Sequence, residues 1–275
     1  MTQKSFDIPS GLYIPAVSNV TPEGSYAGTT RNFNQDVSFN LVPGYVRAFG
    51  IGYNPDVDTG TTPEDCWGYT GLYPWLPTNA VTMLEVVSTN ANDTAAGSGM
   101  QQVSWTTLDI NYNVVVQTVT LNGLTPVPLP FGCIRINGGR GITPRKVNTG
   151  DIILRDVGGG TVRGFIQTGL GTTRQAPYTV PAGRTLAIHQ ILLAVDSPTG
   201  AVGKFASGVT YFSGPTSATV YPLPIGNTNG QPYNHEPDPP IMLSEKMDFS
   251  MVITTASDNN TILTAAWNGI LRTNT

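Results

Sequence analysis

Charged residues and cysteine are both scarce in this sequence. Lys, Arg, Asp and Glu together make up 12% of the 275 residues, about half of the roughly 25% that is usual for soluble domains. The two cysteines, Cys66 and Cys133, are too few for a disulfide framework or a cysteine-based zinc site. We therefore expect two buried thiols, with a single bridge between them as the alternative.

The sequence also lacks the motifs that commonly mark catalytic sites. It has no G-x-S-x-G, H-E-x-x-H or P-loop pattern, and Lys-Ser/Thr does not follow the three glycines at 158–160. His189 lies in an apolar stretch, where we expect a half-buried structural histidine, and His235 lies in a Pro-rich loop. Carboxylates are few, which makes a depolymerising enzyme the least favoured class. We expect no enzyme, no bound metal and no cofactor.

Long apolar runs and concentrated positive charge are missing too. No run is long enough to cross a membrane, and residues 1–7 do not form the apolar core of a secretory signal. The net charge is −4, and the 14 Lys and Arg residues are scattered, whereas nucleic-acid binders carry a basic face. We expect synthesis in a cytoplasm and no binding to nucleic acid or membrane.

Glycine and proline are abundant, and short β-type runs alternate with them. The 31 Gly and 22 Pro residues indicate many tight turns and an all-β fold. Residues 102–107 and 114–121 alternate across an Asn-rich turn and predict a hairpin, followed by a glycine-rich loop at 138–141. Residues 185–195 are apolar on both faces, which favours a central strand.

These runs predict two β-sandwich or jelly-roll-like domains preceded by an extended N-terminal arm. The arm covers residues 1–45 and the first domain residues 46–166. A Gly/Thr-rich linker follows at 167–177, and the second domain covers residues 178–275.

The arm combines prolines with apolar residues. Pro9, Pro15, Pro22 and Pro43 exclude interior strands, because proline lacks the backbone N–H that a sheet requires. Apolar residues in an extended segment need a partner surface, so we expect docking on another protein. The alternative is an edge strand that packs on the chain's own first domain. The candidate interface residues are Phe6, Ile8, Leu12, Tyr13 and Ile14.

Two further clusters are candidate sites. The aromatic residues Trp67, Tyr69, Tyr73 and Trp75 are interpreted as core packing, with a subunit interface or glycan binding as alternatives. The second cluster is acidic and favours a turn, although a Ca²⁺ site remains open because carboxylates are suitable ligands. Its members are Asp56, Asp58, Glu64 and Asp65.

Several turn-plus-strand motifs, taken in order, resemble those of tailed-bacteriophage structural proteins. They are residues 52–60, 65–67, 92–99, 108–113, 118–123, 135–137, 180–185 and 244–249. The resemblance covers roughly residues 45–275, and it is the order of the motifs rather than any one of them that makes it. The N-terminal arm departs most from this pattern.

The resemblance implies a non-enzymatic virion protein made in the cytoplasm of a bacterial host. Its first expectation is a capsid decoration or cement protein that docks on the major capsid protein through its N-terminal arm. A tail, neck or fibre component is the alternative, as is a receptor- or glycan-binding module. By analogy with phage decoration and fibre proteins, we expect a closed homo-oligomer, specifically a trimer.

Overall fold

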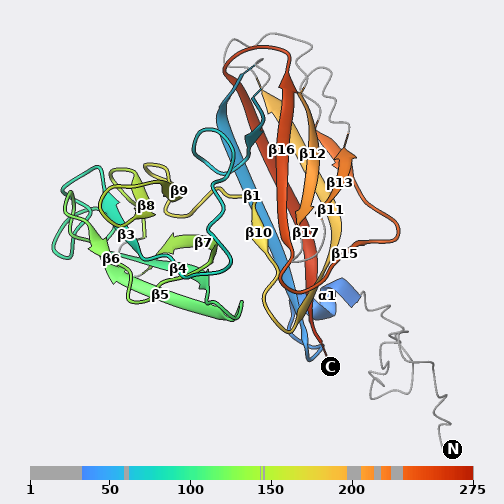
Figure 1. Ribbon diagram of the computed structural model, residues 1–275, viewed down its shortest axis with the longest axis horizontal. Helices are drawn as coiled ribbons and strands as arrows, with labels where there is room; N and C mark the ends of the chain where they lie inside the picture. Colours follow the sequence, from blue (N-terminus) through green and yellow to red (C-terminus); the bar gives the residue numbers. More distant parts are fainter. Residues whose placement is uncertain are drawn as a thin grey trace, which may run out of the picture. The chain divides into compact units, whose positions relative to one another are not determined.

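The computed structural model describes residues 33–58, 62–142, 144, 146–196, 206–213, 218–223 and 232–274. The described chain is almost entirely antiparallel β-structure, which confirms the predicted all-β, sandwich-like class (Figure 1). Two compact units are divided between Arg47 and Ala48.

The first unit contains the one helix of the described residues, α1 (Phe33–Ser38). Asp36 and Val37 of this helix are buried, and the rings of Phe33 and Tyr45 meet edge to face at 5.4 Å. The sequence predicts an extended arm through residue 45, and this is wrong for residues 33–38. Residues 1–32, which include most of that arm, lie outside the described residues.

The second unit contains two pairs of sheets. The first pair, here called the outer sandwich, has one sheet in the order β1 (Tyr45–Val57), β17 (Thr261–Thr273), β11 (Arg184–Asp196), β14 (Tyr233–His235), with β15 (Ile241–Leu243) also on β11. Its other sheet has the order β10 (Tyr178–Thr179), β16 (Asp248–Ala256), β12 (Ala206–Ser213), β13 (Ala218–Leu223), with β2 (Glu64–Asp65) on β16.

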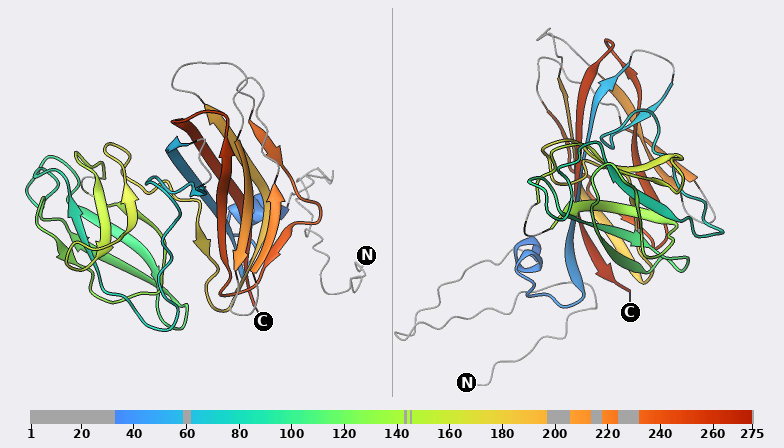
Figure 2. Two further views of the ribbon diagram at one scale, coloured as in Figure 1. Left: turned by 45° about the horizontal axis from the view of Figure 1, so that its top comes forward. Right: turned by 90° about the vertical axis from the view of Figure 1, so that its left-hand side faces the viewer.

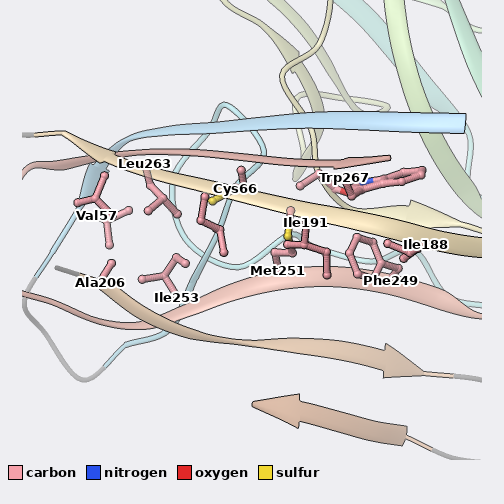
Figure 3. Packing of buried hydrophobic residues seen from close by; sticks show 14 of the residues in the cluster. Val57, Cys66, Ile188, Ile191, Ala206, Phe249, Met251, Ile253, Leu263 and Trp267 are labelled. Atoms are coloured by element: carbon pink, nitrogen blue, oxygen red, sulfur yellow. The ribbon is translucent and has the colours of Figure 1, made fainter. Parts of the chain in front are cut away.

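The core of the outer sandwich is filled by residues of facing strands. Ile188 and Ile191 of β11, on either side of a bulge, pack with Phe249 and Met251 of β16 (Figure 3). Trp267 of β17 pairs with Ile191 and meets the ring of Phe249 edge to face at 5.8 Å. All five side chains are at most 2% exposed. β11 pairs with β17 on one side and with β14 and β15 on the other, so the predicted central strand is confirmed.

The second pair of sheets, here called the inserted sandwich, is formed by residues between β2 and β10. One sheet has the order β6 (Val127–Pro128), β3 (Leu84–Ser88), β8 (Ile152–Asp156), β9 (Val162–Ile166). The other has the order β5 (Val114–Thr120), β4 (Gln102–Leu108), β7 (Arg135–Gly141). The hairpin of β4 and β5 is the one that the sequence predicts.

Trp105 lies at the centre of the inserted sandwich, and two glycines make room for it. A Cβ on Gly139 would lie 2.4 Å from Cε3 of Trp105, and one on Gly164 would lie 2.8 Å from Cζ3. Gly139 belongs to β7, so the predicted glycine-rich loop at 138–141 is wrong. Glycine within a strand can mark the close approach of a bulky neighbour, and here that neighbour is the indole.

The strand pairing also differs from the predicted division into successive domains. The sequence assigns residues 46–166 to one domain, yet β1 pairs with β17 and β2 pairs with β16, so both join the outer sandwich. Figure 2 shows blue β1 at the edge of its sheet, beside red β17. Short-range patterns cannot reveal such pairing, because the partners are separated by nearly the whole chain.

No strand runs through the predicted linker at 167–177, but the backbone there is held in place. The N–H of Tyr53 donates to the carbonyl of Arg174 at 3.2 Å, and the N–H of Ala176 donates to Cys66 at 2.8 Å. Trp267 Nε1 donates to the carbonyl of Ala176 at 3.0 Å. These contacts fix this segment against the outer sandwich.

Candidate functional site

A buried ion pair joins β7 of the inserted sandwich to β16 of the outer sandwich. Arg135 donates from Nε to Oδ1 of Asp248 at 2.8 Å and from Nη2 to Oδ2 at 2.7 Å. The two side chains are only 5% and 10% exposed. This two-bond geometry is the strongest form of arginine–carboxylate contact.

Backbone and hydroxyl groups complete the hydrogen bonding of this pair. Arg135 Nη1 donates to the carbonyls of Leu76 and Ile134, both at 2.7 Å. Thr179 Oγ1 donates to Asp248 Oδ1 at 2.6 Å. Burial by itself would lower the pKa of Arg135, but the hydrogen bond and charge of Asp248 raise it above the usual value. The guanidinium therefore stays charged.

A second set of contacts supports the ion pair. Asn137 Nδ2 donates to the carbonyl of Thr179 at 2.8 Å, and the N–H of Thr179 donates back to Asn137 Oδ1 at 2.9 Å. The side chain of Gln175 donates to the carbonyl of Ile136 at 2.7 Å. The strand end at 135–137 is thus bound to residues from the start of β10 and from the segment before it.

The aromatic segment that the sequence singles out forms a chain of edge-to-face contacts. The ring centroids of Trp67 and Tyr73 are 5.2 Å apart, and those of Tyr73 and Trp75 are 4.7 Å apart. Trp67 and Tyr73 are buried, whereas Tyr69 is 37% exposed. Arg135 lies over the ring of Trp75 at 5.3 Å. Trp67 and Tyr73 thus pack internally, and Tyr69 and Trp75 keep surface that a partner could contact.

The remaining predicted interface residues are in the N-terminal segment. Phe6, Ile8, Leu12, Tyr13 and Ile14 lie outside the described residues, so the structure does not bring them together with the aromatic segment.

The acidic loop is built into the fold through hydrogen bonds. Glu64 accepts from Asn54 Nδ2 and from the N–H of Asp58, each at 3.1 Å. The N–H of Asp56 donates to Asn54 Oδ1 at 3.0 Å, which is a turn contact. Asp65 accepts from the Tyr73 N–H at 2.8 Å and from the Ser250 hydroxyl. These contacts bind the side chains of Glu64 and Asp65, and the backbone of Asp56 and Asp58, into the fold.

No group of three His, Cys, Asp or Glu residues within the described part of the chain could hold a metal ion. His189 is half-buried, and desolvation lowers its pKa. Its Nε2 has no hydrogen-bond partner, whereas His235 stacks on Tyr233.

Both cysteines are buried and free. Among the described residues, no helix is long and apolar enough to cross a membrane.

The sequence does not identify the carboxylate that organises the loops of the inserted sandwich. Asp93 is fully buried and accepts from the backbone N–H groups of Met100, Thr149 and Gly150 at 2.8–2.9 Å. Its Oδ2 also accepts from Ser88 Oγ at 2.7 Å. Burial alone would raise its pKa, but these hydrogen bonds lower it below the usual value. The one available signal is that Asp93 belongs to a phage-like motif.

The pairing of Arg135 with Asp248 is likewise invisible in the sequence, because 113 residues separate the two. Each residue belongs to a phage-like motif, at 135–137 and 244–249 respectively. The motifs therefore point to the residues, although nothing in them points to the contact.

Comparison with known proteins yields little. No protein-family model matches the chain, and no curated protein matches it. A structure of infectious bursal disease virus, Gx strain, is 11% identical with a TM-score of 0.27, and the match covers 83% of this chain and 72% of that chain. A Gt strain structure is 10% identical with a TM-score of 0.22, covering 84% and 71%. Similarity this weak supports neither a shared fold nor a shared function.

Proposed function

We propose that this chain is a non-enzymatic structural protein of a virus particle. The observation that supports the proposal most is the burial of several charged residues of the phage-like motifs. Asp65, Asp93, Arg135 and Asp248 are buried and bound by groups of the chain itself. Asp109 binds the N–H groups of its own turn at 2.8 and 2.9 Å. The charged residues of these motifs therefore stabilise the fold, as expected of a structural protein.

The contact between the two sandwiches around Arg135 also supports a structural role. A buried ion pair whose guanidinium makes four hydrogen bonds resists separation of the strands that carry it, because a single unpaired partner would leave a buried charge. The edge-to-face contacts of Trp67, Tyr73 and Trp75 further stabilise the same region. A body of this kind keeps its geometry when it forms part of a larger assembly.

The finer form of the proposal is a capsid decoration or cement protein of a tailed phage, bound to the shell through its N-terminal segment. It rests on the resemblance of the motifs and on the apolar residues Phe6, Leu12 and Ile14. Burial of a few such side chains is worth several kcal/mol at about 25 cal/mol per Å². Ordering entropy offsets part of this gain, so several arms in an oligomer would bind by avidity.

Antibody labelling of particles tests the location. Gold-labelled antibody against residues 48–275 should decorate phage heads uniformly in negative-stain images. Label at a single vertex would instead support a tail, neck or fibre component. Purified particles that carry no label would overturn the assignment to the virion.

Variants of the N-terminal segment test the docking. Leu12→Ser with Ile14→Ser should abolish incorporation into particles and leave the melting temperature unchanged. Asn19→Ser, in the same segment but without loss of apolar surface, is the matched control. Normal incorporation of the double variant would refute docking through this segment, and a lowered melting temperature would show that it packs on its own chain.

The proposed oligomer is a trimer. Light scattering of the purified protein at micromolar concentration should give three times the 29.2 kDa mass of one chain. A stable monomer at that concentration would refute an autonomous trimer.

A further inference from the structure

A small pocket opens on the surface of the second unit, beside β1. Its volume is about 290 Å³, just below the range of about 300–1,000 Å³ that is typical of small-molecule sites. Space of this size suits one small ligand unit. The lining residues are Ile51, Tyr53, Gln167, Leu170, Arg174 and Thr264.

The walls of the pocket are held in place by hydrogen bonds. The N–H of Tyr53 in β1 donates to the carbonyl of Arg174 at 3.2 Å. The turn that carries Gln167 and Leu170 is fixed by the buried Asn148, whose Nδ2 donates to the Gln167 carbonyl at 2.9 Å. Asn148 Oδ1 accepts from the N–H of Gly171 at 3.0 Å. A ligand would therefore find a preformed site and would spend little free energy on ordering it.

Arg174 differs from the arginines that build the fold. Arg135, Arg155 and Arg163 each form an ion pair with a carboxylate. Arg174 is half-buried, and among the described residues its guanidinium has no hydrogen-bond or ion-pair partner. A guanidinium at the pocket wall with its donors free can bind a carboxylate through two hydrogen bonds.

The other lining residues narrow the choice of ligand. Tyr53, Gln167 and Thr264 bring side-chain groups that can hydrogen-bond to hydroxyls or amides. Ile51 and Leu170 are each 36% exposed and supply an apolar wall. The chain's net charge of −4 does not attract anions in general, so binding of an anion would depend on this local arrangement.

We propose that this pocket binds an acidic sugar, with Arg174 holding the carboxylate. Tyr53, Gln167 and Thr264 contact the hydroxyl or amide groups, and the apolar wall contacts ring or methyl carbons. The pocket opens to solvent, so a longer glycan can extend from the bound sugar. The inference does not depend on the particle location proposed above.

Titration of the full-length protein with simple sugars tests this. The acidic probes are the methyl glycosides of N-acetylneuraminic acid and glucuronic acid, and the neutral probes are methyl glucoside and N-acetylglucosamine. At least one acidic probe should bind, and the methyl resonances of Ile51 and Leu170 should shift on its addition. The neutral probes should bind at least about tenfold more weakly, because they lack the charge-assisted contact.

Substitution of the arginine provides the second arm. Arg174→Gln should weaken the acidic probe about tenfold or more without changing the melting temperature, since the side chain has no internal partner to lose. Arg140→Gln, at an exposed arginine of β7 that does not line the pocket, is the matched control and should bind as the wild type does.

Three results would overturn the inference. One is that neither acidic sugar binds at millimolar concentration. Another is equal affinity of the Arg174→Gln variant and the wild type. The third is binding of a short peptide with a free C-terminal carboxylate when neither acidic sugar binds, which would make the pocket a peptide site.

Discussion

Arg135 and Asp248, 113 residues apart in the sequence, form a two-bond ion pair in which the side chains are 5% and 10% exposed. The pair lies where β7 of the inserted sandwich meets β16 of the outer one. The Leu76 carbonyl and the Thr179 hydroxyl bind the same two side chains. The stability of each sandwich is therefore coupled to the other through one charged contact.

Removing one partner of this pair should be costly. Asp248→Leu or Arg135→Met should lower the free energy of unfolding by about 3–5 kcal/mol, because the remaining group is left buried without compensation. The double variant Arg135→Met with Asp248→Leu should lose less than the sum of the two single changes. Urea denaturation of the four proteins measures the coupling, and additive losses would contradict it. Arg155→Met, in a pair whose arginine is 26% exposed, should cost less and is the control.

Stability should also depend strongly on the carboxylate of Asp93. Asp93→Asn replaces a carboxylate oxygen with an NH₂ group that faces N–H donors, and should cost about 2–3 kcal/mol. The hydrogen bonds lower the pKa of Asp93, so its stabilising effect is present above the ordinary value and is lost as pH falls through the lowered one. The Asp93→Asn variant should lack this acid-dependent loss in thermal unfolding. Asp151→Asn, at a less buried carboxylate, is the comparison.

Asp65 should have the opposite effect on how stability depends on pH. Burial raises the pKa of its carboxyl from 3.8 to about 6, because ionisation is costly inside the outer sandwich. The stability that it contributes is complete below 3.8 and is lost as pH rises through about 6, by roughly 3 kcal/mol in all. Asp65→Asn should therefore gain stability relative to wild type between pH 4 and pH 8. An equal free-energy difference at both pH values would contradict the shift.

The two thiols should be inert until the protein unfolds. Cys66 and Cys133 are both 0% exposed, and burial raises the pKa of each thiol, to about 12 for Cys133. A thiolate is needed for attack on a disulfide reagent, so Ellman's reagent should label neither cysteine in the native state. Both should react at once in denaturant. Labelling of either native thiol would show that its sandwich opens locally.

Local patterns predicted much of the β-structure. The alternation around Trp105 and the turn at 111–113 give the hairpin of β4 and β5, and Tyr112 there has a positive φ of 65°. The doubly apolar run at 185–195 gives the central strand β11. In both cases the signal lies in consecutive residues and needs no knowledge of distant ones.

Contacts between distant residues were beyond such patterns. The glycines at 138–141 predict a loop unless it is known that Trp105 occupies the space beside Gly139. β1 pairs with β17, and nothing in the sequence of either strand predicts that pairing. The same holds for the candidate sites, since Arg174 enters the pocket only because the predicted linker is bound against Tyr53.

The pairing of β1 with β17 and of β2 with β16 has a consequence for synthesis. The inserted sandwich is complete once residue 166 has left the ribosome, and it can fold then as a local unit. The outer sandwich cannot close until the last strand has been made, more than 200 residues after β1. β1 therefore waits without its partner while most of the chain is translated, and loss of β17 would leave it permanently unpaired.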